Sequence, residues 1–132
     1  MARADGVTWV DDSKATNPHA ALASIRSHAS VVLIAGGLAK GIDVRPLAVE
    51  PNVRFVLGIG EAGTDLVEAA GDRGRLAGTL EQAMAMAADL AGPGDTVLLA
   101  PGCASFDQFN SYGERGDMFS QLAREITGGG SN

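Results

Sequence analysis

Residue types that mark several common protein classes are scarce in this chain. Cys103 is the only cysteine among 132 residues, so an internal disulfide cannot form. Aromatic residues make up 5% of the chain, and ten Lys and Arg are scattered among 16 Asp and Glu, for a net charge of −6. Nucleic-acid binding normally needs a basic patch. We therefore expect no nucleic-acid partner.

Long apolar segments are missing as well. No apolar run approaches the roughly 20 residues that span a membrane, and residues 1–6 lack the apolar stretch of a signal peptide. With one cysteine, these features predict a cytoplasmic protein without a membrane partner. The length suits one domain, expected over residues 1–127, and the Gly-rich residues 128–132 suit a flexible tail.

Short apolar runs alternate with helical patterns along the chain. Several runs, such as residues 31–34 and 97–99, are continuously apolar, which is typical of strands buried on both faces of a parallel sheet. The pattern predicts an α/β protein, a three-layer Rossmann-like domain with a mainly parallel sheet of about six strands flanked by helices. Strands are expected at residues 7–10, 31–35, 53–59, 75–77 (weakly) and 96–100, and helices at about 18–29, 44–48, 62–70, 79–90 and 116–126.

Three segments rich in polar residues or glycine follow expected strands. In sheets of this kind, ligands bind beyond the carboxyl ends of the strands. The lysines, hydroxyls and backbone N–H groups of these three segments suit a small dicarboxylate or a phosphate. The segments are residues 11–17, with Asp12, Ser13, Lys14, Thr16 and Asn17; residues 35–41, with three glycines and Lys40; and residues 101–116, with Ser105 and Tyr112.

Signatures of other chemistries are weak or absent. The sequence has no G-x-x-x-x-G-K-[ST] phosphate loop. Residues 58–63 match G-x-G-x-x-G, but after the third expected strand, so dinucleotide binding receives little weight. His19 and His28 have no partner at metal-ligand spacing, so no metal site is expected. No G-x-S-x-G surrounds Ser105, which argues against a hydrolase serine.

Some polar residues have simpler structural interpretations. Asn17 suits a helix N-cap and Pro18 the first helical position. Thr79 is the expected N-cap of a later helix, because residues 79–82 read as a capping box. Ser13 is expected to stabilise the turn, and Cys103 to pack in the interior.

The three segments together resemble the C-terminal domain of the Mur ligases, and most closely that of the ligases that add D-glutamate. The family pattern N-D-S-K-A-T-N corresponds to D-D-S-K-A-T-N at residues 11–17, and G-G-x-x-K to residues 36–40. The family's S-P-x-C-A-S-x-D-Q-F corresponds to A-P-G-C-A-S-F-D-Q-F at residues 100–109. Order and spacing agree from about residue 7 to 126. Asp11 stands where the family has Asn, and Tyr112 where it often has Phe.

The resemblance implies roles for individual residues. It assigns no catalytic residue and no metal ligand to this domain alone. Thr16 and Lys40 would hold the α-carboxylate of D-glutamate, and Ser105, with backbone near Tyr112, would bind its side-chain carboxylate. Asp12 would bind the ribose hydroxyls of ATP, and Lys14 would lie near the ATP phosphates.

The resemblance also implies a reaction. The family's three-domain ligases join D-glutamate to UDP-N-acetylmuramoyl-L-alanine in peptidoglycan biosynthesis, using ATP and Mg²⁺ bound mainly by a central domain. This chain resembles the third domain alone, so we expect it to be monomeric and inactive by itself.

Two alternatives stay open. One is the equivalent domain of another Mur or folylpolyglutamate-type ligase, although relatives that add other amino acids tend to carry a D-Y-A-H-x-P segment in place of residues 12–17. The other is a stand-alone α/β module that binds a nucleotide or a small anion.

Overall fold

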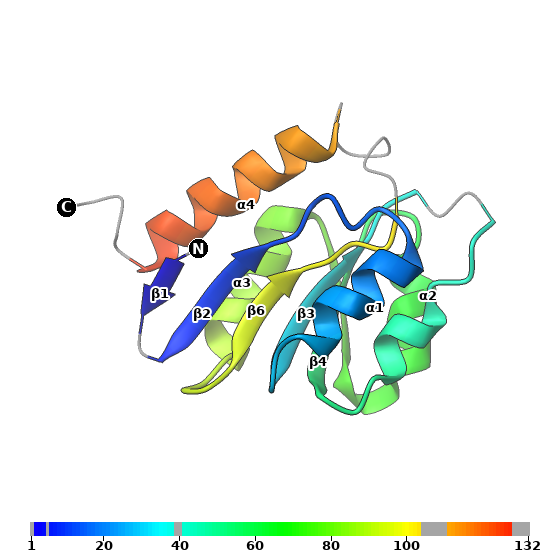
Figure 1. The fold of residues 1–132 in the computed structure, drawn as a ribbon, viewed down its shortest axis with the longest axis horizontal. Coiled ribbons are helices and arrows are strands. Elements are labelled where there is room, and N and C mark those ends of the chain that lie inside the picture. The colour runs from blue at the N-terminus through cyan, green and yellow to red at the C-terminus, as the bar shows by residue number, and fades with distance from the viewer. Residues whose placement is uncertain (1, 5, 39–40, 104–110, 128–132) are drawn as a thin grey trace.

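The fold is a six-stranded sheet covered by helices on both faces (Figure 1). The computed structural model describes residues 2–4, 6–38, 41–103 and 111–127. The strand order is β1-β2-β6-β3-β4-β5, with β1 antiparallel to β2 and all other neighbours parallel. The strands are β1 (Ala2–Ala4), β2 (Val7–Asp11), β3 (Val31–Gly36), β4 (Val53–Ile59), β5 (Gly74–Gly78) and β6 (Thr96–Leu99).

The predicted fold class and the five predicted strands are confirmed. Every residue of the central strand β3 is buried, as expected for a continuously apolar strand between two helical layers. Strand β1 was not predicted. Alanine has low strand propensity, and this short segment becomes a strand because it pairs with β2, where Ala2 lies opposite Trp9.

Helices cover the two faces of the sheet in pairs (Figure 1). Helices α1 and α2 lie on one face with the 3₁₀ turn η1, and α3 and α4 lie on the other. No helix in the described part of the chain is long and apolar enough to cross a membrane. The helices are α1 (Pro18–Arg26), α2 (Gly63–Ala70), α3 (Leu80–Leu90) and α4 (Tyr112–Thr127), and the 3₁₀ turns are η1 (Arg45–Val49) and η2 (Gly71–Arg73).

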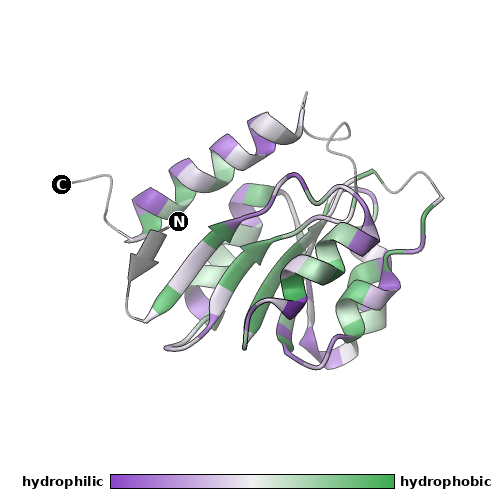
Figure 2. Ribbon diagram, viewed as in Figure 1, coloured by the Kyte–Doolittle hydropathy of each residue, from purple (hydrophilic) through white to green (hydrophobic). Residues whose placement is uncertain are grey.

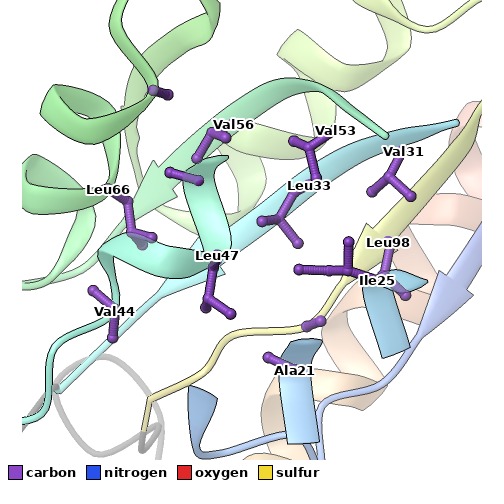
Figure 3. Close-up of a cluster of buried hydrophobic side chains, with 14 of the residues drawn as sticks. Ala21, Ile25, Val31, Leu33, Val44, Leu47, Val53, Val56, Leu66 and Leu98 are labelled. Carbon is purple, nitrogen blue, oxygen red and sulfur yellow. The ribbon is translucent and has the colours of Figure 1, made fainter. Parts of the chain in front are cut away.

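Two hydrophobic cores result, one on each side of the sheet. On the first side, Leu33 and Leu98 from the sheet meet Ile25 of α1, Leu47 of η1 and Leu66 of α2 (Figure 3). The second core gathers apolar side chains of α3 and α4 against the opposite sheet face. The apolar residues concentrate in the strands, while the helices also carry polar residues (Figure 2).

Side-chain hydrogen bonds cap the starts of α1 and α3 and the end of α1. Asn17 Oδ1 accepts a hydrogen bond from the Ala20 N–H at 2.9 Å, and Thr79 Oγ1 accepts one from the Gln82 N–H at 3.2 Å. Both predicted N-caps are confirmed. Helix α1 ends at Arg26 rather than near residue 29. There the Ser27 hydroxyl donates back to the Ser24 carbonyl at 2.7 Å and closes the last turn.

The predicted start of the last helix, at residue 116, is wrong. Helix α4 begins at Tyr112, because Ser111 Oγ accepts a hydrogen bond from the Glu114 N–H at 3.1 Å. Ser111 and Glu114 have the S-x-x-E spacing of a capping box, and this signal outweighs the low helix propensity of Gly113 and Gly116.

Candidate functional site

The strand order brings the three polar segments together at one edge of the sheet. They follow β2, β6 and β3, which are neighbours in that order. The Gly102 N–H donates to the Ala15 carbonyl at 2.8 Å, and the Gly36 N–H donates to the Pro101 carbonyl at 3.0 Å. The segment after β6 is therefore hydrogen-bonded to the segments on both sides of it.

A buried arginine strengthens the connection between the first and third segments. Arg115 of α4 is 1% exposed. Its Nε donates to Ser13 Oγ at 3.1 Å, and its Nη2 donates to the carbonyls of Ser13 and Cys103 at 3.1 and 3.3 Å. Sequence reasoning gave Arg115 no role, because nothing in the pattern of residues around it signals a buried cation.

Next to this arginine lies a polar hollow of about 320 Å³. It is bounded by the turn after β2 on one side and by the first turns of α4 on the other. Three carboxylates and one ammonium group line it. The lining residues are Asp11, Asp12, Ser13, Lys14, Gly113, Gly116 and Asp117.

Asp11 lines this hollow in an unfavourable environment for its charge. Partial burial raises the pKa of the Asp11 carboxyl, and the carboxylates of Asp12 and Asp117 raise it further. The Ser13 N–H, which donates to Asp11 Oδ1 at 2.9 Å, and the Arg115 guanidinium act in the opposite direction. A Cβ on Gly116 would stand 2.6 Å from Asp11 Oδ2. Glycine at position 116 therefore lets α4 approach this carboxylate.

The structure places three of the six predicted ligand residues with their side chains. Asp12 is half-buried and Lys14 exposed, and both line the hollow. Thr16 is half-buried two residues further along the same turn. The backbone of Tyr112 opens α4. Lys40 and Ser105 lie outside the described residues.

The structural roles predicted for Asn17 and Cys103 are confirmed. Ser13 is buried against Arg115, and Cys103 is 1% exposed in the core beneath α1. Asn17 caps α1. Among the residues with described positions, no group of three or more His, Cys, Asp or Glu side chains could hold a metal ion.

Known proteins are similar to this chain in sequence. A family model described as "Mur ligase, glutamate ligase domain" matches residues 1–103. The chain is 44% identical over 141 residues to the UDP-N-acetylmuramoylalanine–D-glutamate ligase of Leifsonia xyli, covering 96% of this chain and 27% of that protein. It is 46% identical over 135 residues to the enzyme of the same name from Hahella chejuensis, covering 96% of this chain and 30% of that protein. The chain thus spans under a third of the length of these relatives.

A solved structure agrees at the level of the fold. It is a domain assigned to a UDP-N-acetylmuramate:L-alanyl-γ-D-glutamyl-meso-diaminopimelate ligase from Haemophilus ducreyi. The TM-score is 0.60 at 12% identity, with 92% of this chain and 96% of that chain covered. Together with the family match, these similarities establish that the chain belongs to the Mur ligase family, as a glutamate ligase domain.

Proposed function

We propose that this chain is the amino-acid-binding domain of an ATP-dependent ligase that joins D-glutamate to UDP-N-acetylmuramoyl-L-alanine in peptidoglycan biosynthesis. The observation that carries the proposal is the identity of 44–46% to D-glutamate ligases over 96% of the chain. The hydrogen-bonded edge formed by the three segments supports it, because a small dicarboxylate needs cationic and hydroxyl groups from more than one loop.

The amino acid would bind through the residues that the family resemblance assigns. Lys40 and Thr16 would hold the α-carboxylate, and Ser105, with backbone near Tyr112, would hold the side-chain carboxylate. An ammonium group and two hydroxyls are suitable donors to carboxylates. Two separated carboxylate contacts would also fix the direction in which the amine points.

ATP would bind at the hollow lined by Asp12 and Lys14. The carboxylate of Asp12 can accept hydrogen bonds from ribose hydroxyls, and the exposed ammonium of Lys14 can attract phosphate oxygens. One acceptor and one cationic donor therefore suit the ribose and the phosphates of a nucleotide. Mg²⁺ would be held mainly by another part of the ligase, because the described residues contain no group of three or more His, Cys, Asp or Glu side chains that could hold a metal ion.

The chemistry would be amide formation through an acyl phosphate. The carboxylate oxygen of UDP-N-acetylmuramoyl-L-alanine attacks the γ-phosphorus of ATP, and ADP leaves. The D-glutamate nitrogen then attacks the acyl carbon, the C–O bond to phosphate breaks, and the amine loses a proton. This domain would contribute by orienting the amine and by excluding water when it closes over ATP.

The isolated chain would be a monomer. It would show no turnover, because it contains no G-x-x-x-x-G-K-[ST] phosphate loop. Its place of action would be the cytoplasm. We expect no ATP-dependent phosphate release when this chain alone is mixed with D-glutamate and the UDP-sugar. Measurable turnover would overturn this part of the proposal.

Steady-state kinetics of the complete ligase test the proposed function. Lys40→Ala or Ser105→Ala should raise the KM for D-glutamate about 10- to 100-fold, the effect of losing a hydrogen bond to a charged group, with a much smaller change in the KM for ATP. Asp12→Asn is the matched control and should mainly raise the KM for ATP. Equal effects on both KM values in all three variants would contradict the assignment of two separate subsites.

A further inference from the structure

The G-x-G-x-x-G motif forms the turn between β4 and α2, and two of its glycines are in backbone contact. A Cβ on Gly58 would stand 2.5 Å from the Gly63 carbonyl oxygen, and a Cβ on Gly63 would stand 2.8 Å from the Gly58 carbonyl carbon. Real Cβ atoms do not approach backbone this closely. Glycine at both positions therefore lets the start of α2 pack directly on the end of β4.

This turn is hydrogen-bonded in both directions to the segment after β3. The Gly37 N–H donates to the Ile59 carbonyl at 3.1 Å, and the Ala62 N–H donates to the Gly37 carbonyl at 2.9 Å. Gly36 contributes through its missing side chain, since a Cβ there would stand 1.9 Å from the Ile59 oxygen. Ile59 and Ala62 are 1% and 2% exposed, so these bonds are shielded from water.

The direction of the Ala62 N–H distinguishes this turn from a nucleotide-binding one. In dinucleotide-binding turns of the same pattern, the pyrophosphate sits at the helix N-terminus, where free N–H groups point at it. Here the Ala62 N–H, at the N-cap of α2, donates to Gly37 of the same chain. Gly37 precedes Lys40 by three residues.

We propose that the Gly58–Gly63 turn is a positioning element for the segment that carries Lys40, and through it for the α-carboxylate of the incoming amino acid. The proposal rests on the proposed function for the role of Lys40. A Cβ on Gly63 would push α2 away from β4 and carry the Ala62 N–H away from Gly37. Displacements of about 1 Å at a substrate-positioning group can cost 100-fold in rate.

The test compares Gly63→Ala with Gly74→Ala in the complete ligase. Gly74 is the matched control because a Cβ there would stand 2.6 Å from the Val67 carbonyl oxygen, also at α2 but away from the segment after β3. Neither glycine has a positive φ. Both variants should lower the Tm. Gly63→Ala alone should raise the KM for D-glutamate at least about tenfold, with the KM for ATP within about twofold of wild type.

A second variant covers the case in which Gly63→Ala does not fold. Ala62→Pro removes the N–H that donates to Gly37, and the Ala62 φ of −78° lies in the range of proline. It should show the same selective rise in the KM for D-glutamate. An unchanged ratio of the two KM values in the folded variants, or the same change of that ratio in Gly74→Ala, would overturn the proposal.

Lys40→Ala, measured in parallel, distinguishes failure of the positioning proposal from failure of the proposed function. If Lys40→Ala raises the KM for D-glutamate but neither turn variant does, the positioning inference fails and the proposed function stands. If Lys40→Ala leaves that KM unchanged, the proposed function fails, and the positioning inference fails with it.

Discussion

The guanidinium of Arg115 donates a hydrogen bond to the hydroxyl of Ser13 at 3.1 Å, although the two residues are 102 positions apart in sequence. The same side chain also reaches the carbonyls of Ser13 and Cys103. One buried arginine thereby joins the turn after β2, the segment after β6 and helix α4. All three elements carry residues assigned to the proposed ligands, since α4 begins at Tyr112.

Replacing this arginine should destabilise the whole domain. In Arg115→Lys a single ammonium cannot reproduce the planar fork that reaches Ser13 and Cys103, so buried carbonyls lose donors. We expect a loss of about 3 kcal/mol in the free energy of unfolding, measured by urea denaturation of the chain. Arg124→Lys, at an exposed position of the same helix, should change it by no more than about 0.5 kcal/mol. Similar values for the two variants would show that the buried contacts contribute little.

A second buried polar group stabilises the opposite end of the sheet. Asp95 is 4% exposed, accepts hydrogen bonds from the Ser30 hydroxyl at 2.6 Å and the Gly92 N–H at 2.8 Å, and pairs with Arg54. Asp95→Ala leaves these donors unpaired and should lower the free energy of unfolding by about 2 kcal/mol.

Asp89→Ala provides the control for that measurement, because Asp89 is exposed on α3. Its effect should stay within about 0.5 kcal/mol. Kinetic parameters of the complete ligase should change little in Asp95→Ala, because the residue lies at the amino end of β6, away from the site. A large selective change in one KM would contradict this separation of stability from binding.

The raised pKa of Asp11 predicts a pH-dependent gain from Asp11→Asn. Burial and two neighbouring carboxylates disfavour the ionised form in the folded state. The stability linked to this group is therefore present below the unfolded pKa of about 3.9 and is lost as the pH rises through the folded pKa. Asn keeps an Oδ1 acceptor for the Ser13 N–H and carries no charge. Asp11→Asn should be more stable than wild type at pH 7.

The gain should shrink as the pH falls toward 3, because the wild-type carboxyl is then protonated. Urea denaturation of both proteins at several pH values measures it, with Asp89→Asn as an exposed control. A gain that grows on acidification would show that the folded state favours the Asp11 carboxylate.

The fold could be predicted from the sequence wherever one local signal dominated. Continuous apolar runs predicted the buried parallel strands, and the Asn17 and Thr79 caps predicted two helix starts. Strand β1 could not be predicted, because it depends on pairing with β2. The early start of α4 was missed although the spacing of Ser111 and Glu114 signals it, because the glycines that follow argue against a helix.

The candidate site was only partly accessible to sequence reasoning. Asp12, Lys14 and Thr16 share one short segment and could be found by composition and resemblance. The burial of Arg115 depends on the packing of α4 against two loops. The role of Gly58 and Gly63 depends on a backbone approach between β4 and α2. Neither relationship has a sequence pattern of its own, since the same G-x-G-x-x-G letters also describe a nucleotide-binding turn.

The most direct test of the central claim is an NMR titration of this chain, labelled with ¹⁵N, with D-glutamate and separately with L-glutamate. The account predicts that D-glutamate shifts the amide signals of residues 11–17, 36–40 and 101–106, that L-glutamate does so more weakly, and that Lys40→Ala abolishes these shifts. Equal shifts with both enantiomers, shifts confined to other parts of the chain, or no shifts at all would contradict a D-glutamate site at this edge of the sheet.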